Sequence, residues 1–202
     1  MKTRNLSILL VLVFVIAGAV VASGARADGE IPAAPAIGAT IEDFTLPDVD
    51  NKDRSLKSLA GKNGTVLLFI AVQCPVSNAY NERMEKLAQD YKAKGIAVVG
   101  INANVAEDAA AVKKHASEHS LTFPILKDPG NKIADKLGAS VTPEAYFIDA
   151  NNKLLYHGRI DNSRNAAQVE TSDLRNALDA ALNDKPIEKT EARAFGCTIK
   201  RA

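Results

Sequence analysis

Continuous apolar runs separated by amphipathic stretches organise the chain. Residues 65–72 (TVLLFIAV) and 96–102 (IAVVGIN) are apolar on both faces, which is typical of central strands buried between helices. A shorter run at 122–128 (TFPILKD) predicts a third strand. Two further β-rich runs, 145–149 and 153–160, flank a polar turn and predict a β-hairpin.

Amphipathic patterns between these runs predict helices. Over residues 75–94, Val76, Tyr80 and Leu87 recur at helical spacing among charged residues. Pro75 suits the first turn of that helix, where the missing N–H of proline is not needed. Further helices are expected at 107–120, at 131–138 and from 171 to about 183.

The order of these elements predicts the fold class. Two short extended pieces within residues 41–56 precede the first long strand, after which strands and helices alternate. Strand–helix alternation predicts an α/β sheet with helices on both faces, and the late hairpin makes that sheet mixed. We assign residues 37–185 to one domain that begins with a hairpin, residues 28–36 to a linker and residues 186–202 to a C-terminal tail.

The N-terminus has the three parts of a secretory signal. Lys2 and Arg4 precede an uncharged stretch at 6–22, and small residues follow up to Ala27. We therefore predict a signal peptide over 1–27 and an exported protein, periplasmic or extracellular. The alternative is an uncleaved anchor that holds the domain at a membrane, facing away from the cytoplasm.

Composition narrows the function classes. The 202 residues carry a formal net charge of +1 with no long basic run, which argues against a dedicated nucleic-acid binder. Two cysteines are too few for a disulfide-framed miniprotein or a four-cysteine zinc site. Both Cys74 and Cys197 lie beyond the predicted cleavage point, and an oxidising compartment would allow them to form a disulfide.

Cys74 stands directly after a predicted buried strand and directly before a predicted helix. The free N–H groups and the dipole of a helix N-terminus stabilise a thiolate, which is the reactive form of cysteine. We interpret Cys74 as a nucleophile. The alternative is a buried cysteine that serves as a small hydrophobic residue.

Several segments together resemble the thioredoxin-like superfamily. They include VLLFIAVQCPVS, VVGIN, FPILKD, LGASVTPEAYFID and LLYHGRID, and the resemblance covers roughly residues 37–183. It is strongest to the redoxin branch, which contains peroxiredoxins and thiol-disulfide oxidoreductases. The resemblance implies a thioredoxin-like fold and a thiol-dependent oxidoreductase without a cofactor. Its expected partners are protein or small-molecule thiols and disulfides, with peroxides as the alternative.

Several positions distinguish between the branches of the superfamily. Ser77 replaces the second cysteine of a Cys-x-x-Cys site; it either donates a hydrogen bond to the Cys74 thiolate or satisfies backbone N–H groups at the helix start. Peroxiredoxins resemble the chain at Cys74–Pro75, but Leu67 and Ala71 occupy the positions of their Pro and Thr, and the family arginine is missing near Glu144. We therefore expect slow peroxide reduction.

The resemblance also implies roles for a proline loop and for the tail. Thr142 and Pro143 match the cis-proline loop, in which the residue before the proline offers its backbone to a substrate strand. Pro75, Thr142 and Pro143 are thus expected at the substrate site. Cys197 is suggested as the resolving thiol, carried by a loosely held tail outside the fold proper; the alternative is an unrelated thiol that pairs between chains.

Other classes rest on weaker features. His115 and His119 are four residues apart on a predicted helix, but neighbouring charges indicate a solvated face rather than a metal pair, and we assign no metal site. A copper-binding protein of the same fold would have Cys74, Cys197 and His157 as its obvious soft ligands. A redox-silent binding module that uses the same cleft is the remaining alternative.

Overall fold

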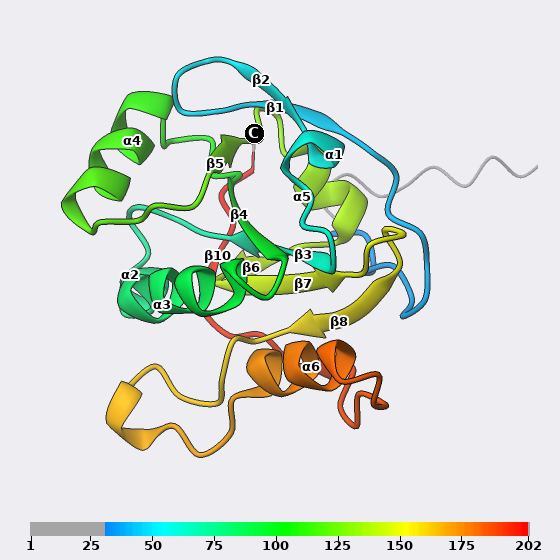
Figure 1. The fold of residues 1–202 in the computed structure, drawn as a ribbon. Coiled ribbons are helices and arrows are strands. Elements are labelled where there is room, and N and C mark those ends of the chain that lie inside the picture. The colour runs from blue at the N-terminus through cyan, green and yellow to red at the C-terminus, as the bar shows by residue number, and fades with distance from the viewer. Residues whose placement is uncertain (1–30, 202) are drawn as a thin grey trace, which may run out of the picture. The chain divides into compact units, whose positions relative to one another are not determined.

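The computed structural model describes residues 31–201. Within them the main sheet has six strands in the order β5-β4-β3-β7-β8-β9 (Figure 1). Its strands are β3 (Gly64–Phe69), β4 (Ile96–Asn102), β5 (Ile125–Lys127), β7 (Glu144–Ile148), β8 (Leu154–Gly158) and β9 (Glu191–Ala192).

The sheet is mixed, as the sequence predicts. Strand β3 runs parallel to β4 and antiparallel to β7, β4 is parallel to β5, and β7 is antiparallel to β8. Strand β9 then joins β8 in parallel at the opposite edge. An N-terminal hairpin of β1 (Thr45–Pro47) and β2 (Asp53–Ser55) forms a separate small sheet. The predicted α/β class and the hairpin are confirmed.

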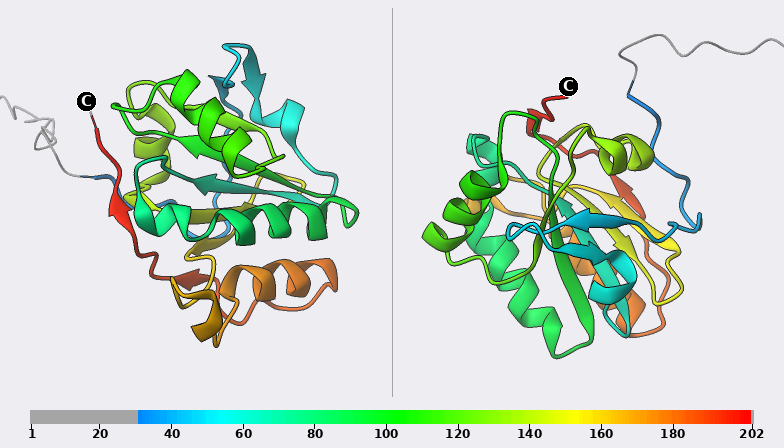
Figure 2. Two further views of the ribbon diagram at one scale, coloured as in Figure 1. Left: turned by 90° about the vertical axis from the view of Figure 1, so that its left-hand side faces the viewer. Right: turned by 90° about the horizontal axis from the view of Figure 1, so that it is seen from above.

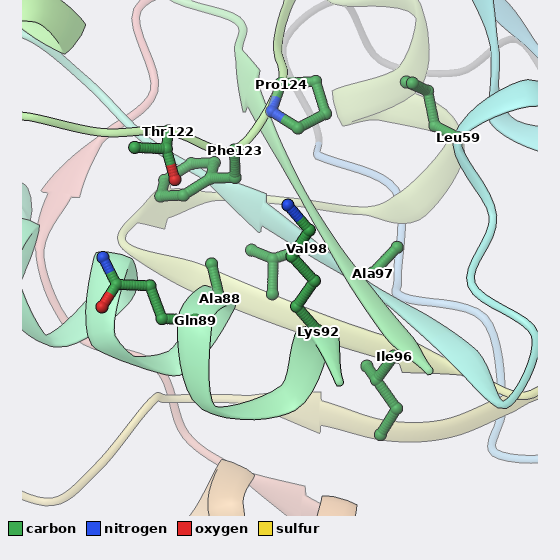
Figure 3. Close-up of a pocket in the computed structure, with 10 residues that line it drawn as sticks. All are labelled: Leu59, Ala88, Gln89, Lys92, Ile96, Ala97, Val98, Thr122, Phe123 and Pro124. Atoms are coloured by element: carbon green, nitrogen blue, oxygen red, sulfur yellow. The ribbon is translucent and has the colours of Figure 1, made fainter. Parts of the chain in front are cut away.

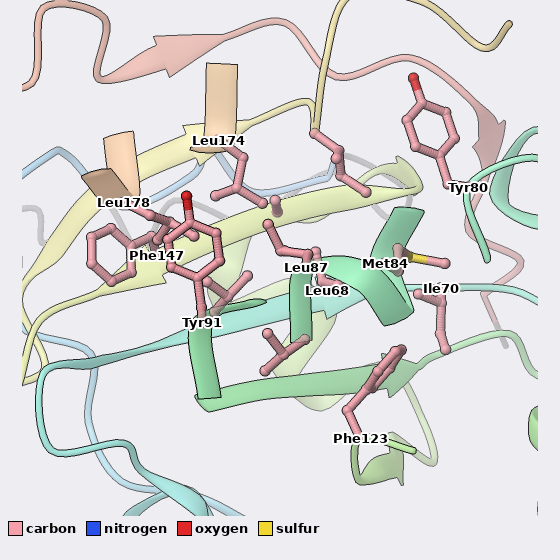
Figure 4. Packing of buried hydrophobic residues seen from close by; sticks show 14 of the residues in the cluster. Leu68, Ile70, Tyr80, Met84, Leu87, Tyr91, Phe123, Phe147, Leu174 and Leu178 are labelled. Atoms are coloured by element: carbon pink, nitrogen blue, oxygen red, sulfur yellow. The ribbon is translucent and has the colours of Figure 1, made fainter. Parts of the chain in front are cut away.

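Alternation along β3 builds two apolar layers. Val66, Leu68 and Ile70 face one side, and Leu67 and Phe69 face the other, because successive side chains of a strand point to opposite faces. The first layer packs against α3 (Asn81–Lys92) and α6 (Asp173–Leu182), as Figure 4 shows. The second packs against α1 (Leu56–Leu59) and α5 (Lys132–Leu137). Figure 2 shows these helices on the two faces of the sheet.

The single helix predicted over 75–94 is wrong. The structure has α2 (Pro75–Asn78) followed by α3, with Ala79 and Tyr80 between them. Tyr80 is almost fully buried there, and its hydroxyl donates a hydrogen bond to Asp161 at 2.8 Å. The break therefore serves a contact with a distant segment, which helical periodicity does not report.

Of the remaining elements, the helix predicted over 107–120 is present, and three short elements were not predicted. The helix is α4 (Ala109–Glu118), and the short elements are the two-residue strand β6 (Val141–Thr142), the 3₁₀ turn η1 (Ala166–Gln168) and β10 (Cys197–Thr198). The predicted tail at 186–202 does not lie outside the fold, because β9 extends the main sheet and β10 pairs with β6. No helix among residues 31–201 is long and apolar enough to cross a membrane. The predicted signal peptide lies outside the described residues.

Candidate active site

Cys74 lies at the end of the loop that follows β3 and caps the N-terminus of α2. Its sulfur accepts a hydrogen bond from the Ser77 backbone N–H at 3.2 Å. The thiol also contacts the backbone carbonyl oxygen of Thr142 at 3.2 Å. Pro75 is the first residue of α2, as predicted. Cys74 is only 3% exposed, so its sulfur is reachable only when its covering segments move.

The hydrogen bond from Ser77 to Cys74 comes from the backbone of Ser77 and not from its hydroxyl. The hydroxyl accepts a hydrogen bond from the Ala71 backbone N–H at 3.2 Å, and the contact to the Cys74 sulfur comes from the Ser77 backbone. Of the two readings of this residue, satisfaction of backbone donors is the arrangement seen. Ser77 is buried, so it helps to hold the end of β3 against the start of α2.

A buried carboxylate that sequence reasoning missed holds the loop before Cys74. The two oxygens of Glu107 accept hydrogen bonds from the backbone N–H groups of Val72 and Gln73, each at 2.9 Å. The amides of Asn102 and Asn104 donate to the same oxygens, at 2.5 and 3.0 Å. Burial raises the pKa of Glu107, but these hydrogen-bond donors lower it by more. The pKa of Glu107 therefore lies below its ordinary value.

The proline loop lies on the other side of Cys74. The Thr142–Pro143 bond is cis, which confirms the expectation from the family resemblance. The next residue, Glu144, is buried, and its carboxylate accepts from the Ser140 and Val141 N–H groups at 2.8 and 3.1 Å. Its other oxygen lies 2.6 Å from Nε2 of His157. Glu144 thereby holds the backbone at the start of β6.

The C-terminal tail pairs with β6. Strand β10 pairs antiparallel with β6, with Cys197 opposite Thr142 and Thr198 opposite Val141. The N–H of Ile199 continues the pairing by donating to the Ser140 carbonyl at 3.0 Å. Both cysteines are reduced in this arrangement. The expectation of a loosely held tail is wrong, because backbone pairing fixes the tail beside Cys74.

The two thiols differ in acidity. Burial raises the pKa of Cys74, but hydrogen bonds from the Cys197 and Thr142 side chains and from the Ser77 and Cys197 backbones lower it by more. Its pKa therefore lies below the ordinary value. Burial and the adjacent Cys74 raise the pKa of Cys197, although the Val76 backbone opposes this. Cys74 is thus the first of the two to become a thiolate, with Cys197 as a protonated neighbour.

Other predicted residues lie elsewhere or have other partners. His115 is buried, against expectation, and its Nε2 lies 3.1 Å from the Asn81 side-chain nitrogen. His157 is engaged with Glu144, and among residues 31–201 there is no group of three or more His, Cys, Asp or Glu arranged to hold a metal ion. Leu67 and Ala71, at the peroxiredoxin positions, are buried.

A hollow of about 240 Å³ lies away from this site, between α3, β4 and the segment before β5 (Figure 3). Its walls are mostly apolar and include Leu59, Ile96, Phe123 and Pro124. Neither cysteine lines it, so it does not contribute to the chemistry at Cys74.

Comparisons with known proteins agree with this geometry. The profile of the AhpC/TSA family matches residues 37–157. A thiol-disulfide oxidoreductase ResA of Bacillus thuringiensis (strain Al Hakam) is 30% identical over 158 residues, covering 77% of this chain and 88% of the relative.

Solved structures show the same fold. A hypothetical protein of Sinorhizobium meliloti 1021 is 33% identical with a TM-score of 0.78, covering 84% of this chain and 96% of the other. A structure titled as a putative thiol:disulfide interchange protein DsbE of Chlorobium tepidum is 25% identical with a TM-score of 0.61, covering 73% and 98%. The predicted redoxin branch and the thiol-dependent oxidoreductase class are confirmed. With the family profile matched over more than half of its length, the chain belongs to the AhpC/TSA family.

Proposed function

We propose that this protein is a thiol-disulfide oxidoreductase in which Cys74 is the nucleophile and Cys197 is the resolving thiol. One observation carries the proposal: Cys197 pairs with Thr142, the residue whose carbonyl contacts the Cys74 sulfur. The second thiol that Ser77 does not supply is thus provided from the far end of the sequence. The low pKa of Cys74 and the raised pKa of Cys197 support this division of roles.

The exchange proceeds in two steps. The Cys74 thiolate attacks one sulfur of a substrate disulfide, which forms a mixed disulfide and releases the other substrate sulfur as a thiolate. Cys197, after losing its proton to solvent, attacks the Cys74 sulfur and releases the second substrate thiol. The substrate gains two electrons, and the protein retains a Cys74–Cys197 disulfide. An external dithiol reduces that disulfide and restores both thiols.

Neighbouring residues support these steps. The Ser77 backbone N–H stabilises the thiolate that leaves or attacks, and its hydroxyl keeps the loop end in place. Pro75 begins α2 without a competing donor. Thr142 and Pro143 form the edge at which a substrate strand would lie. We infer that the substrates are protein or small-molecule disulfides, and that the protein works outside the cytoplasm because of the predicted signal at 1–27.

The test is disulfide exchange with insulin as the substrate, followed by peptide mapping without reductant. Cys74→Ser should abolish turnover. Cys197→Ser should accumulate a mixed disulfide between Cys74 and substrate, because no internal thiol releases it. If mild oxidation produces no linkage between Cys74 and Cys197 and Cys197→Ser turns over normally, Cys197 is not the resolving thiol.

A further inference from the structure

The last residues of the described chain form a strap over the nucleophile. We use the name C-terminal strap for residues 193–201. Upstream, β9 holds it to the main sheet, where the Arg159 N–H donates to the Ala192 carbonyl at 3.0 Å. At its centre, β10 lies on β6 and against α2, so the strap crosses the site of Cys74. The 3% exposure of Cys74 is measured with the strap in place.

Beyond Cys197 the strap has a second, smaller anchor. Ile199 is buried in the apolar layer that faces α5. The N–H of Lys200 donates a hydrogen bond to the Asn104 side-chain oxygen at 2.8 Å, and its carbonyl accepts one from the Val105 N–H at 3.0 Å. Arg201 pairs with Asp135 at 2.9 Å on the surface. This anchor is short and follows the cysteine, so its release frees β10 while β9 stays in the sheet.

The strap can lie against β6 only because residue 196 is a glycine and has no side chain. A Cβ at this position would lie 1.9 Å from the Thr142 carbonyl oxygen and 2.6 Å from the carbonyl carbon. Both neighbours are backbone atoms of β6, so they cannot rotate away. The strap therefore approaches β6 more closely than any residue with a side chain allows. Phe195 adds an edge-on contact to the Tyr80 ring, with centroids 6.4 Å apart.

The same edge of β6 cannot hold two strands. When the strap leaves, the backbone groups of Val141 and Thr142 become free to pair with another extended segment. We propose that the C-terminal strap is an internal competitor for this edge: it closes over Cys74, must open to admit an extended cysteine-bearing segment of a substrate, and displaces that segment when it returns. This inference rests on the proposed function, since it describes how the same site is opened and closed.

Strand exchange then links resolution to release. With the strap open, the Cys74 thiolate attacks the substrate disulfide and holds the substrate by one disulfide bond and by β6. The returning strap takes the place of the substrate strand on β6 and brings the Cys197 thiolate to the Cys74 sulfur. The Cys74–Cys197 bond forms as the bond to substrate breaks, and the substrate leaves as a thiol. No further oxidant or reductant enters these two steps.

Alkylation by iodoacetamide tests the closed strap without needing turnover. In a Cys197→Ser background only Cys74 reacts, and at high pH the rate constant reaches a plateau that no longer depends on the fraction of Cys74 that is ionised. Adding Gly196→Ala should raise this plateau roughly tenfold or more, because local opening then no longer limits access. Glu118→Gln is the control, because Glu118 is exposed on α4; it should leave the plateau unchanged.

Hydrogen exchange checks that the strap itself has moved. The Ile199 amide, bonded to Ser140, should lose protection in Gly196→Ala while β3 and β4 keep theirs. Arg201→Ala is a second variant that loosens the strap from its other end, should Gly196→Ala fail to fold. Two results would overturn the proposal. One is a detached strap with the same plateau rate constant of Cys74 alkylation as in the protein that keeps Gly196. The other is a folded Gly196→Ala protein in which the Ile199 amide keeps its protection.

A peptide supplied in trans tests the competition for β6. The probe is the acetylated peptide RAFGCTIKR, the sequence of residues 193–201, with its cysteine activated by thionitrobenzoate. The Gly196→Ala, Cys197→Ser protein should react with it roughly tenfold faster than with RAFACTIKR, because only glycine fits against Thr142. Equal rates would refute the shared edge. The alkylation and peptide experiments both measure the reaction of Cys74 alone and need no turnover. An absence of turnover with insulin would therefore contradict the proposed function without affecting these two results.

Discussion

At the scale of single residues, opposing effects set the reactivity of Cys74. Burial disfavours its thiolate, whereas donors from Cys197, Thr142 and Ser77 favour it, and the donors win. The largest of these favourable contributions comes from the Cys197 side chain. Cys197 thus favours the Cys74 thiolate while the C-terminal strap is closed.

The first prediction follows from that contribution. In the reduced protein, alkylation of Cys74 should show a pH midpoint below the ~8.5 of a free cysteine. Cys197→Ala removes the donor and should move the midpoint upward. Mass spectrometry of the peptide that contains Cys74 follows the rate against pH. A midpoint at or above ~8.5 in the unmodified protein would contradict this account.

Peroxide reduction is the second test at this scale. Leu67 and Ala71 offer no hydroxyl near Cys74, and Glu144 adds a buried carboxylate where the family arginine would stand. Peroxide cleavage needs donors for the negative charge that develops on oxygen. We expect slow oxidation by hydrogen peroxide in stopped-flow measurements, and little recovery from Ala71→Thr alone, because such groups act as a unit. Oxidation near the diffusion limit would refute this expectation.

At the scale of elements, Glu107 joins the two segments that carry the cysteines. Its carboxylate binds the backbone before Cys74 directly. It also accepts from Asn104, whose oxygen receives the Lys200 N–H of the C-terminal strap. The ammonium of Lys127 lies 2.5 Å from the Asn102 oxygen beside them. One buried carboxylate therefore organises the loop after β3, the loop after β4 and the strap.

The third prediction concerns Glu107→Gln. Its amide would face N–H groups that need an acceptor, so the free energy of unfolding should fall by about 1–3 kcal/mol at neutral pH. The folded-state pKa of Glu107 is lowered, so its stabilisation is complete above the unfolded-state pKa and is lost as pH falls through the folded value. The difference between the two proteins should thus shrink below about pH 4.

Urea unfolding at several pH values measures this difference. Glu118→Gln is the control, because Glu118 is exposed on α4, and it should change stability by no more than ~0.5 kcal/mol. A Glu107→Gln protein as stable as the control, or a difference that grows toward acid pH, would show that this carboxylate does not hold the loop.

At the scale of the whole molecule, the chain closes on itself at the active site. Cys74 lies between β3 and α2, and Cys197 lies 123 residues later in the sequence. The pairing of β10 with β6 nevertheless places Cys197 beside the site of Cys74. A disulfide between them would close a loop that spans most of the domain. The closure removes conformational freedom from the unfolded chain and leaves an arrangement already present when both thiols are reduced.

The fourth prediction is a redox-dependent stability. The oxidised protein should unfold at a higher temperature or urea concentration than the reduced protein. For a loop of this length, its free energy of unfolding should be larger by up to about 4–5 kcal/mol. Cys197→Ser serves as the control and should unfold identically with and without reductant. An oxidised protein that maps to Cys74–Cys197 and is less stable than the reduced one would oppose this prediction.

Sequence patterns alone predicted the architecture and the position of Cys74 at the start of a helix. Apolar runs at 65–72 and 96–102 identified the two central strands, because a strand buried on both faces requires apolar residues at every position. The junction between strand and helix placed Cys74 at a helix N-terminus. These features depend on neighbours close in sequence, which is why periodicity and capping reveal them.

Only the tertiary structure decided how the site is assembled. The partner of the Ser77 hydroxyl, the break at Tyr80 and the role of Glu107 depend on groups brought together by folding. The position of Cys197 depends on the pairing of β10 with β6, and Gly196 matters only because the Thr142 carbonyl lies against it. Backbone pairing between distant segments leaves little trace in composition or spacing, since any extended segment offers the same N–H and C=O groups.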